Sequence, residues 1–138
     1  RGYNQPSWPE RQIADVIANA PKILVVDDEP SMLRYLQTLL EVESYNVDTA
    51  PSGEAAMEKL QKGAPDVVLL DVLMPGGMDG LETLEKMRER HPQLKVIMLS
   101  CVSDTRKVVQ AIRLGAQDYL TKPFQEAELF AKCSSSPR

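Results

Sequence analysis

The sequence has very few cysteine and histidine residues. Among 138 residues there are two cysteines, Cys101 and Cys133, and a single histidine, His91. Two cysteines cannot build a disulfide framework, and free thiols suit a reducing compartment, so we expect a cytoplasmic protein. His91 follows the charged run Arg88-Glu89-Arg90 and precedes a proline. We expect it at a solvated helix end, and not as a phosphotransfer histidine.

An excess of positive charge and a long apolar run are also missing. Sixteen basic side chains face twenty acidic ones, for a net charge of −4. This balance argues against direct nucleic-acid binding by this domain. No apolar run reaches the roughly 18 residues that span a bilayer, and the N-terminus lacks a signal-peptide core, so we expect no membrane association. The apolar fraction of 43 % is enough for the core of one domain.

Two hydrophobic periodicities alternate from Lys22 onward. Short apolar runs at 23–26, 67–70 and 96–99 predict buried strands, and weaker strands are expected at 46–50 and 118–121. Helical spacing fills the gaps between them, and Gly63 and Gly115 follow two of these stretches as helix ends. The alternation predicts an α/β fold with a doubly wound, five-stranded parallel sheet. The helical positions are Leu33, Leu36, Leu40, Ala55, Leu60, Leu81, Leu84, Met87, Val108, Val109 and Ile112.

Both ends of the chain differ from this pattern. We expect residues 1–21 to form an extension, and its alternatives are a linker or a short docking or dimerising helix. The helix is favoured by the capping-box form Ser7-x-x-Glu10 and by apolar residues at helical spacing after it. The domain itself is expected over 22–133 with a short or truncated last helix, followed by a disordered tail at 134–138.

Polar residues fall at the ends of the predicted strands. Asp27 and Asp28 follow the first strand, Asp71 follows the third, Ser100 ends the fourth and Lys122 ends the fifth. Because parallel strands all point the same way, these side chains are expected to converge at the carboxyl edge of the sheet, where ligands of open α/β sheets bind.

The expected cluster has a definite chemistry. Three neighbouring carboxylates repel one another and raise their pKa values unless a cation joins them. An all-oxygen site favours a hard ion such as Mg²⁺, which keeps positions for phosphate oxygens. Lys122 and Ser100 can hold further oxygens of a transferring phosphoryl group, and a carboxylate is the most consistent nucleophile.

Four segments carry a family resemblance. They are Ile23-Leu24-Val25-Val26-Asp27-Asp28-Glu29, Val68-Leu69-Leu70-Asp71-Val72-Leu73-Met74-Pro75, Ile97-Met98-Leu99-Ser100 and Asp118-Tyr119-Leu120-Thr121-Lys122-Pro123. With them, residues 22–130 resemble the receiver domain of two-component response regulators. The resemblance implies a flavodoxin-like (βα)5 fold with strand order 2-1-3-4-5 and a cis Lys122–Pro123 bond.

The resemblance also implies a role for each site residue. Asp71 would be the phosphoacceptor, and Mg²⁺ or Mn²⁺ would be held by Asp28, Asp71 and the Leu73 carbonyl, with Asp27 acting through water. Ser100 and Lys122 would contact the phosphoryl group. Ser100 and Tyr119 would form the switch.

The implied partner is a sensor histidine kinase or a phosphotransfer protein, which supplies a phosphohistidine. The chain would act as a switch with only self-phosphorylation and autodephosphorylation activity. Its 104–130 face is a candidate homodimer surface, and its output, expected to be transcriptional, would lie in a domain outside this chain.

Three features depart from the family pattern. Gly76-Gly77 lengthens the loop after Asp71 by one residue, so we expect a more mobile loop. Cys101 stands where a smaller residue is usual. Leu73 and Val102 are apolar where other members hold a hydrolytic water, which predicts slow autodephosphorylation.

Other functions on the same architecture require different residues at these positions. An aspartate-dependent phosphohydrolase requires a carboxylate two residues after its nucleophile, where this chain has Leu73. A flavodoxin-like cofactor binder requires a Gly-, Ser- or Thr-rich loop after the first strand, where this chain has Asp27-Asp28-Glu29. A phosphorylation-independent interaction module stays open as the alternative.

Overall fold

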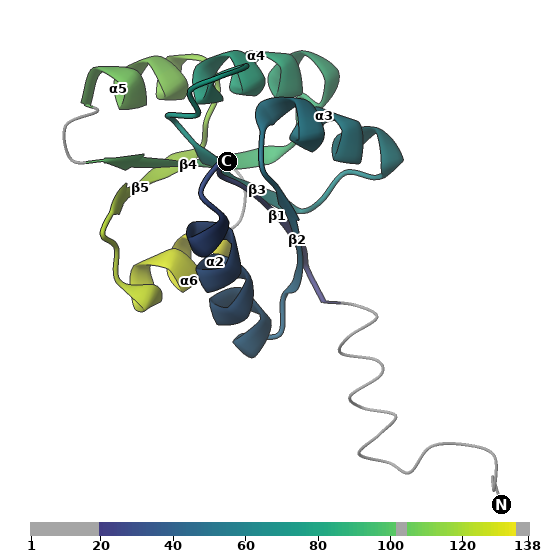
Figure 1. The fold of residues 1–138 in the computed structure, drawn as a ribbon, viewed down its shortest axis with the longest axis vertical. Coiled ribbons are helices and arrows are strands. Elements are labelled where there is room, and N and C mark those ends of the chain that lie inside the picture. Colours follow the sequence, from purple (N-terminus) through teal and green to yellow (C-terminus); the bar gives the residue numbers. More distant parts are fainter. Residues whose placement is uncertain (1–19, 102–104, 135–138) are drawn as a thin grey trace, which may run out of the picture.

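The computed structural model describes residues 20–101 and 105–134, in which five strands alternate with five helices (Figure 1). The strands are β1 (Lys22–Val26), β2 (Asn46–Ala50), β3 (Val67–Asp71), β4 (Lys95–Cys101) and β5 (Asp118–Lys122). The helices are α2 (Pro30–Val42), α3 (Gly53–Lys62), α4 (Gly80–Arg90), α5 (Thr105–Arg113) and α6 (Glu126–Ser134). All strand pairs are parallel, in the order β2-β1-β3-β4-β5. The predicted fold is confirmed.

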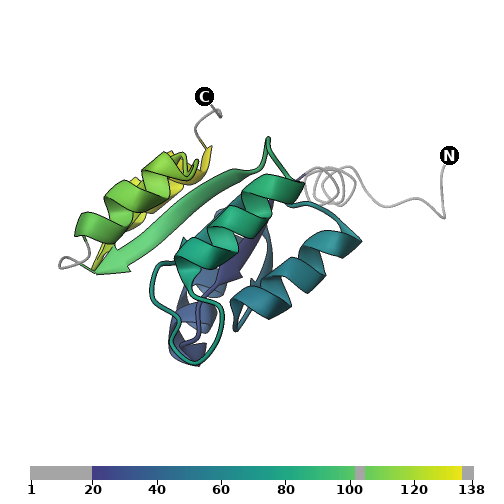
Figure 2. The ribbon, with the colours of Figure 1, turned by 90° about the horizontal axis from the view of Figure 1, so that it is seen from above.

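The helices cover both faces of the sheet. Helices α3, α4 and α5 lie side by side on one face, and α2 and α6 lie on the other (Figures 1 and 2). Because successive strand side chains point to opposite faces, β1 sends Leu24 and Val26 into the first layer and Ile23 and Val25 into the second. A sheet that is covered on both faces accounts for strands that are apolar throughout.

The described residues include the first strand and the last helix of the fold. β1 begins at Lys22, and α6 ends at Ser134, one residue beyond the expected limit of the domain. The expected extension, except for residues 20 and 21, and the remainder of the tail lie outside the described residues. Among the helices that the structure describes, none is long and apolar enough to cross a membrane.

Helix α5 buries a different residue from those that its apolar spacing suggests. Ala111 is fully buried, whereas Val109 and Ile112 are 45 % and 44 % exposed. Ala111 faces the core layer that α3 and α4 share. Val109 and Ile112 therefore lie on the outward side of α5. Tyr119 on β5 is also exposed, at 42 %.

Arg88 joins the end of α4 to the turn before β5. Its guanidinium donates to the carbonyls of Pro92, Leu94 and Gly115 at 2.8, 2.7 and 2.7 Å. A side chain at Gly115 would collide with Arg88, and the φ of +107° at Gly115 also favours glycine. One cation thus satisfies carbonyls from two loops.

We predict that Arg88→Met lowers the free energy of unfolding by about 2–4 kcal/mol, because the partly buried carbonyls of Leu94 and Gly115 lose their charged donor. Urea denaturation measures the change. The control is Arg90→Met, an exposed position in the same helical turn, which is expected to change it by less than about 0.5 kcal/mol. Equal losses in the two variants would contradict the role of Arg88.

Candidate functional site

Three carboxylates meet at the carboxyl ends of β1 and β3. Asp27 follows β1 and is fully buried, Asp28 is exposed, and Asp71 ends β3 with 7 % exposure. One oxygen of each carboxylate lies within 4.8 Å of the others. The adjacent, parallel pairing of β1 and β3 produces this convergence, as the sequence predicts.

Lys122, at the end of β5, brings a positive charge to the cluster. Its Nζ donates to Asp27 Oδ2 at 3.0 Å and lies 3.6 Å from Asp71 Oδ1. Burial alone would lower the pKa of Lys122, but the hydrogen bond to Asp27 and the charges of Asp71 and Asp27 raise it above its ordinary value. Lys122 therefore stays charged at neutral pH.

Asp71 is the carboxylate whose environment disfavours its charge most clearly. Burial and the neighbouring Asp27 charge raise the pKa of Asp71 to about 6, against the opposing effects of Lys122 and of the Leu73 amide. That amide donates to Asp71 Oδ1 at 3.3 Å. One lysine thus compensates only part of the cluster's negative charge, which is the condition that a divalent cation relieves.

Ser100 is a buried polar residue at this edge of the sheet. It precedes the last residue of β4 and is 2 % exposed, and its Oγ makes no hydrogen bond within the described part of the chain. A buried hydroxyl without a partner is costly, so an oxygen-rich ligand at this edge would satisfy it. Hard oxygen donors, a cation and an unpaired hydroxyl together fit Mg²⁺ and a phosphoryl group.

The remaining expected residues lie around this cluster. The Leu73 side chain is 40 % exposed beside Asp71, and Cys101 is exposed directly after Ser100, opposite Lys122 in the strand register. The Lys122–Pro123 bond is cis, as expected. Val102 lies outside the described residues.

Tyr119, the expected switch residue, lies at the surface with 42 % exposure. The Lys132 ammonium sits 5.0 Å from the centre of its ring and donates to its carbonyl. The structure therefore brings Asp27, Asp28, Asp71 and Lys122 together, with Ser100 near the end of β4 at the same edge of the sheet. It leaves the ring of Tyr119 exposed.

Sequence reasoning missed a contact on the loop after Asp71. The Met78 amide donates to the carboxylate of Glu54, in the first turn of α3, at 3.1 Å. No local pattern marks this contact, because the two residues lie 24 positions apart.

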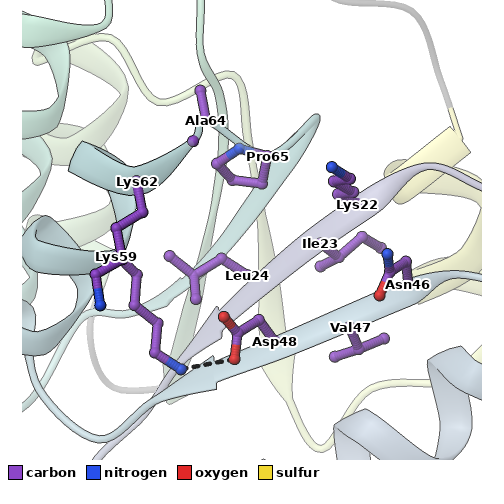
Figure 3. A pocket seen from close by; sticks show the side chains of 11 residues that line it. Lys22, Ile23, Leu24, Asn46, Val47, Asp48, Lys59, Lys62, Ala64 and Pro65 are labelled. Atoms are coloured by element: carbon purple, nitrogen blue, oxygen red, sulfur yellow. Dashed lines mark hydrogen bonds and ion pairs between the residues drawn. The ribbon is translucent and has the colours of Figure 1, made fainter.

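A hollow of about 460 Å³ lies at the opposite, amino-terminal end of β1 and β2 (Figure 3). Lys59 points into it and pairs with Asp48 at 2.6 Å. Burial would raise the pKa of Asp48, but its hydrogen bond and ion pair with Lys59 lower it. Because Lys59 and Asp48 already neutralise each other, this hollow is a weaker candidate for a ligand site than the carboxyl edge of the sheet.

We predict that Asp71→Asn raises the free energy of unfolding at pH 7, in the absence of metal, by roughly 1–3 kcal/mol. The pKa of about 6 in the folded protein lies above the ordinary value of 3.8, so the carboxylate costs stability as the pH rises from about 4 to above 6. Urea denaturation in EDTA at pH 7 and pH 4 tests this. The gain should vanish at pH 4, and an Asn variant less stable than wild type at pH 7 would contradict it.

Comparisons of the sequence with known proteins identify a single kind of domain. Residues 23–134 match the family model of the response regulator receiver domain. Two relatives are each 40 % identical over 111 residues, which is 80 % of this chain: the alkaline phosphatase synthesis transcriptional regulatory protein PhoP of Bacillus subtilis (strain 168) and the transcriptional regulatory protein DltR of Streptococcus agalactiae serotype III (strain NEM316). The match covers 46 % and 49 % of their lengths, so this chain spans about half of each.

Solved structures agree with these sequence matches. The receiver domain of NtrX from Brucella abortus superposes with a TM-score of 0.78 at 34 % identity, covering 83 % of this chain and 99 % of that one. The chemotaxis protein CheY4 of Vibrio cholerae gives 0.76 at 32 % identity, covering 81 % and 94 %. This chain belongs to the receiver domain family of two-component response regulators.

Proposed function

We propose that this receiver domain accepts a phosphoryl group on Asp71 and uses it to switch a partner or output. The observation that carries the proposal is the cluster of Asp27, Asp28 and Asp71, which Lys122 contacts, with the unpaired Ser100 hydroxyl near the carboxyl end of β4. Catalysis of such a transfer is mostly positioning and charge neutralisation, and these side chains offer both.

The metal in this proposal is Mg²⁺, or Mn²⁺ in its place. Asp28, Asp71 and the Leu73 carbonyl would hold it, with Asp27 contributing through water. When bound, it would neutralise negative charge on the phosphoryl oxygens.

In the transfer step, a carboxylate oxygen of Asp71 attacks the phosphorus of a phosphohistidine. The phosphorus–nitrogen bond breaks as the new phosphorus–oxygen bond forms, and the imidazole leaves as the neutral base after taking up a proton. The donor would be a sensor histidine kinase or a phosphotransfer protein, and a small phosphodonor such as acetyl phosphate would lose acetate in the same way. Lys122 and Ser100 would each bind a phosphoryl oxygen.

The switch follows from the same contacts. Rotation of Ser100 toward the phosphoryl group would leave space behind it, and the Tyr119 ring would turn inward from its exposed position. The phosphoryl group would thereby shift the population between two packings of the β5 surface.

The surface of residues 104–130 is our candidate for a homodimer interface. It includes the exposed apolar residues Val109, Ile112 and Tyr119. Helix α5 carries only basic charges, including Arg106 and Arg113, whereas α6 begins with Glu126 and Glu128. In a two-fold pair, the α5 of one protomer would face the α6 of its partner.

We also propose the context of the domain. We assign residues 22–133 to the receiver unit, residues 1–21 to an extension, and a transcriptional output to a segment beyond this chain, in a cytoplasmic protein. The support is that the curated relatives are transcriptional regulators about twice as long as the matched segment. An interaction module that works without phosphorylation is the alternative, and the intact set of acidic, lysine and serine side chains speaks against it.

We predict that acetyl phosphate with Mg²⁺ adds one phosphoryl group to the protein, because Asp71 lies within the acidic cluster. Intact-mass spectrometry measures the adduct. It should vanish in EDTA and in Asp71→Asn, and persist in the control Asp66→Asn, an exposed position outside the cluster. A wild-type protein that gains no Mg²⁺-dependent adduct would favour the interaction module.

A second prediction concerns the lifetime of the phosphorylated form. The exposed, apolar Leu73 side chain cannot orient a water toward Asp71, so hydrolysis is expected to be slow. Leu73→Asn should speed the loss of the adduct by about tenfold, because its amide can position that water. Leu73→Met, a volume-conserving apolar change, is the control. Equal decay in wild type and Leu73→Asn would reject this explanation.

A further inference from the structure

The first turn of α3 and the loop after Asp71 are joined by one carboxylate. Glu54 Oε2 accepts the Met78 amide at 3.1 Å, and a side chain at Gly77 would begin 3.2 Å from the same oxygen. Hydrogen bonds from the Glu54 and Met78 amides hold the pKa of Glu54 below its usual range. The carboxylate is therefore ionised at neutral pH and available as an acceptor.

The position of Glu54 is fixed by its neighbours although its side chain is exposed. The preceding residue, Gly53, is buried so tightly that any side chain there would collide with Thr83 of α4 and crowd Met78. Ser52 accepts the Ala55 amide and sets the start of the helix. These contacts fix the backbone of the first turn of α3, and with it the point from which the Glu54 side chain extends.

The loop that Glu54 contacts begins and returns beside the acceptor. At its start, the Leu73 amide donates to Asp71 Oδ1, and at its end the Gly80 amide donates to the Val72 carbonyl at 3.1 Å. Any side chain at Gly80 would collide with the Asp71 carbonyl, so the returning segment passes directly against the acceptor's backbone.

Between these ends, Met74 is buried in the core, but the exposed residues that follow it have little intrinsic constraint. Gly76 and Gly77 are exposed, and Gly76 has a φ of +95°. Consecutive glycines carry large backbone freedom, so a hydrogen bond on the next residue, Met78, limits the loop strongly.

We propose that Glu54 is a positioning residue for the reaction at Asp71. Its carboxylate fixes Met78 and thereby keeps the amide and carbonyl of Leu73 in place beside the acceptor. This inference rests on the proposed function, in which the Leu73 carbonyl is a metal ligand, and Glu54 itself touches neither metal nor phosphoryl group.

The test compares Glu54→Ala with Glu54→Gln. In Glu54→Gln, the side-chain carbonyl can still accept the Met78 amide. The variant lacks the negative charge of the carboxylate, which in wild type also interacts favourably with the N-terminus of α3. We expect Glu54→Ala to weaken Mg²⁺ binding about three- to tenfold and to speed hydrogen exchange of the Met78 amide. Glu54→Gln should remain close to wild type in both measurements, which NMR titration and exchange provide.

The matched control is Glu58→Ala, one turn later on the exposed face of α3, which should leave Mg²⁺ binding unchanged. A purely structural role for Glu54 would lower the unfolding free energy in both Glu54 variants without changing the Mg²⁺ dissociation constant. That result, or equally weakened binding in Glu54→Gln and Glu54→Ala, would overturn the proposal.

The proposed function can fail separately from this inference. If wild type binds Mg²⁺ but acetyl phosphate adds no phosphoryl group, the function fails, whereas the Mg²⁺ titration still decides the role of Glu54. If wild type binds no Mg²⁺, both are overturned.

Discussion

Repulsion among three carboxylates is the constraint around which this domain is organised. Asp27 is fully buried and Asp71 nearly so, and an oxygen of each lies within 4.8 Å of one from Asp28. Lys122 reaches Asp27 and Asp71, but it contributes one positive charge against three negative ones. Burial of its carboxylate, together with this imbalance, raises the pKa of Asp71. Bringing these carboxylates together costs stability. A divalent cation would neutralise their charge, and the cation could then bind a phosphoryl group at the same site.

The fold supplies the cluster through the ends of its strands. Two apolar layers fix the parallel sheet, and the register of β1, β3, β4 and β5 aligns the strand ends that carry the polar side chains. In the proposed switch, two segments near this edge would respond to its charge state. One is the loop that Glu54 restrains, and another is β5, where Tyr119 lies under the Lys132 ammonium.

Local sequence patterns predict the parts of the structure that repeat. The apolar runs around Val25, Leu69 and Ile97 give strands because a sheet covered on both faces needs apolar residues at every position. Asp71, Ser100 and Lys122 could be placed at one edge because parallel strands share a direction.

Contacts between distant segments could not be predicted in this way. Arg88 reaches Gly115 across 27 positions, and Glu54 reaches Met78 across 24, so no periodicity signals either bond. The spacing of Val109 and Ile112 suggested an inward face, but the small Ala111 is the residue that packs against the core. Which side of a short helix is buried depends on its neighbours as well as on its own pattern.

The central claim is that a divalent cation relieves the repulsion at this edge. It is tested most directly by thermal unfolding of wild type and Asp28→Asn at pH 7 over a range of Mg²⁺ concentrations, with NaCl to match ionic strength. Mg²⁺ at ten times its dissociation constant should stabilise wild type by about 1.4 kcal/mol, and the same concentrations should stabilise Asp28→Asn much less. The claim would be contradicted if the unfolding temperature of wild type did not change with Mg²⁺, or if it rose equally in wild type and Asp28→Asn.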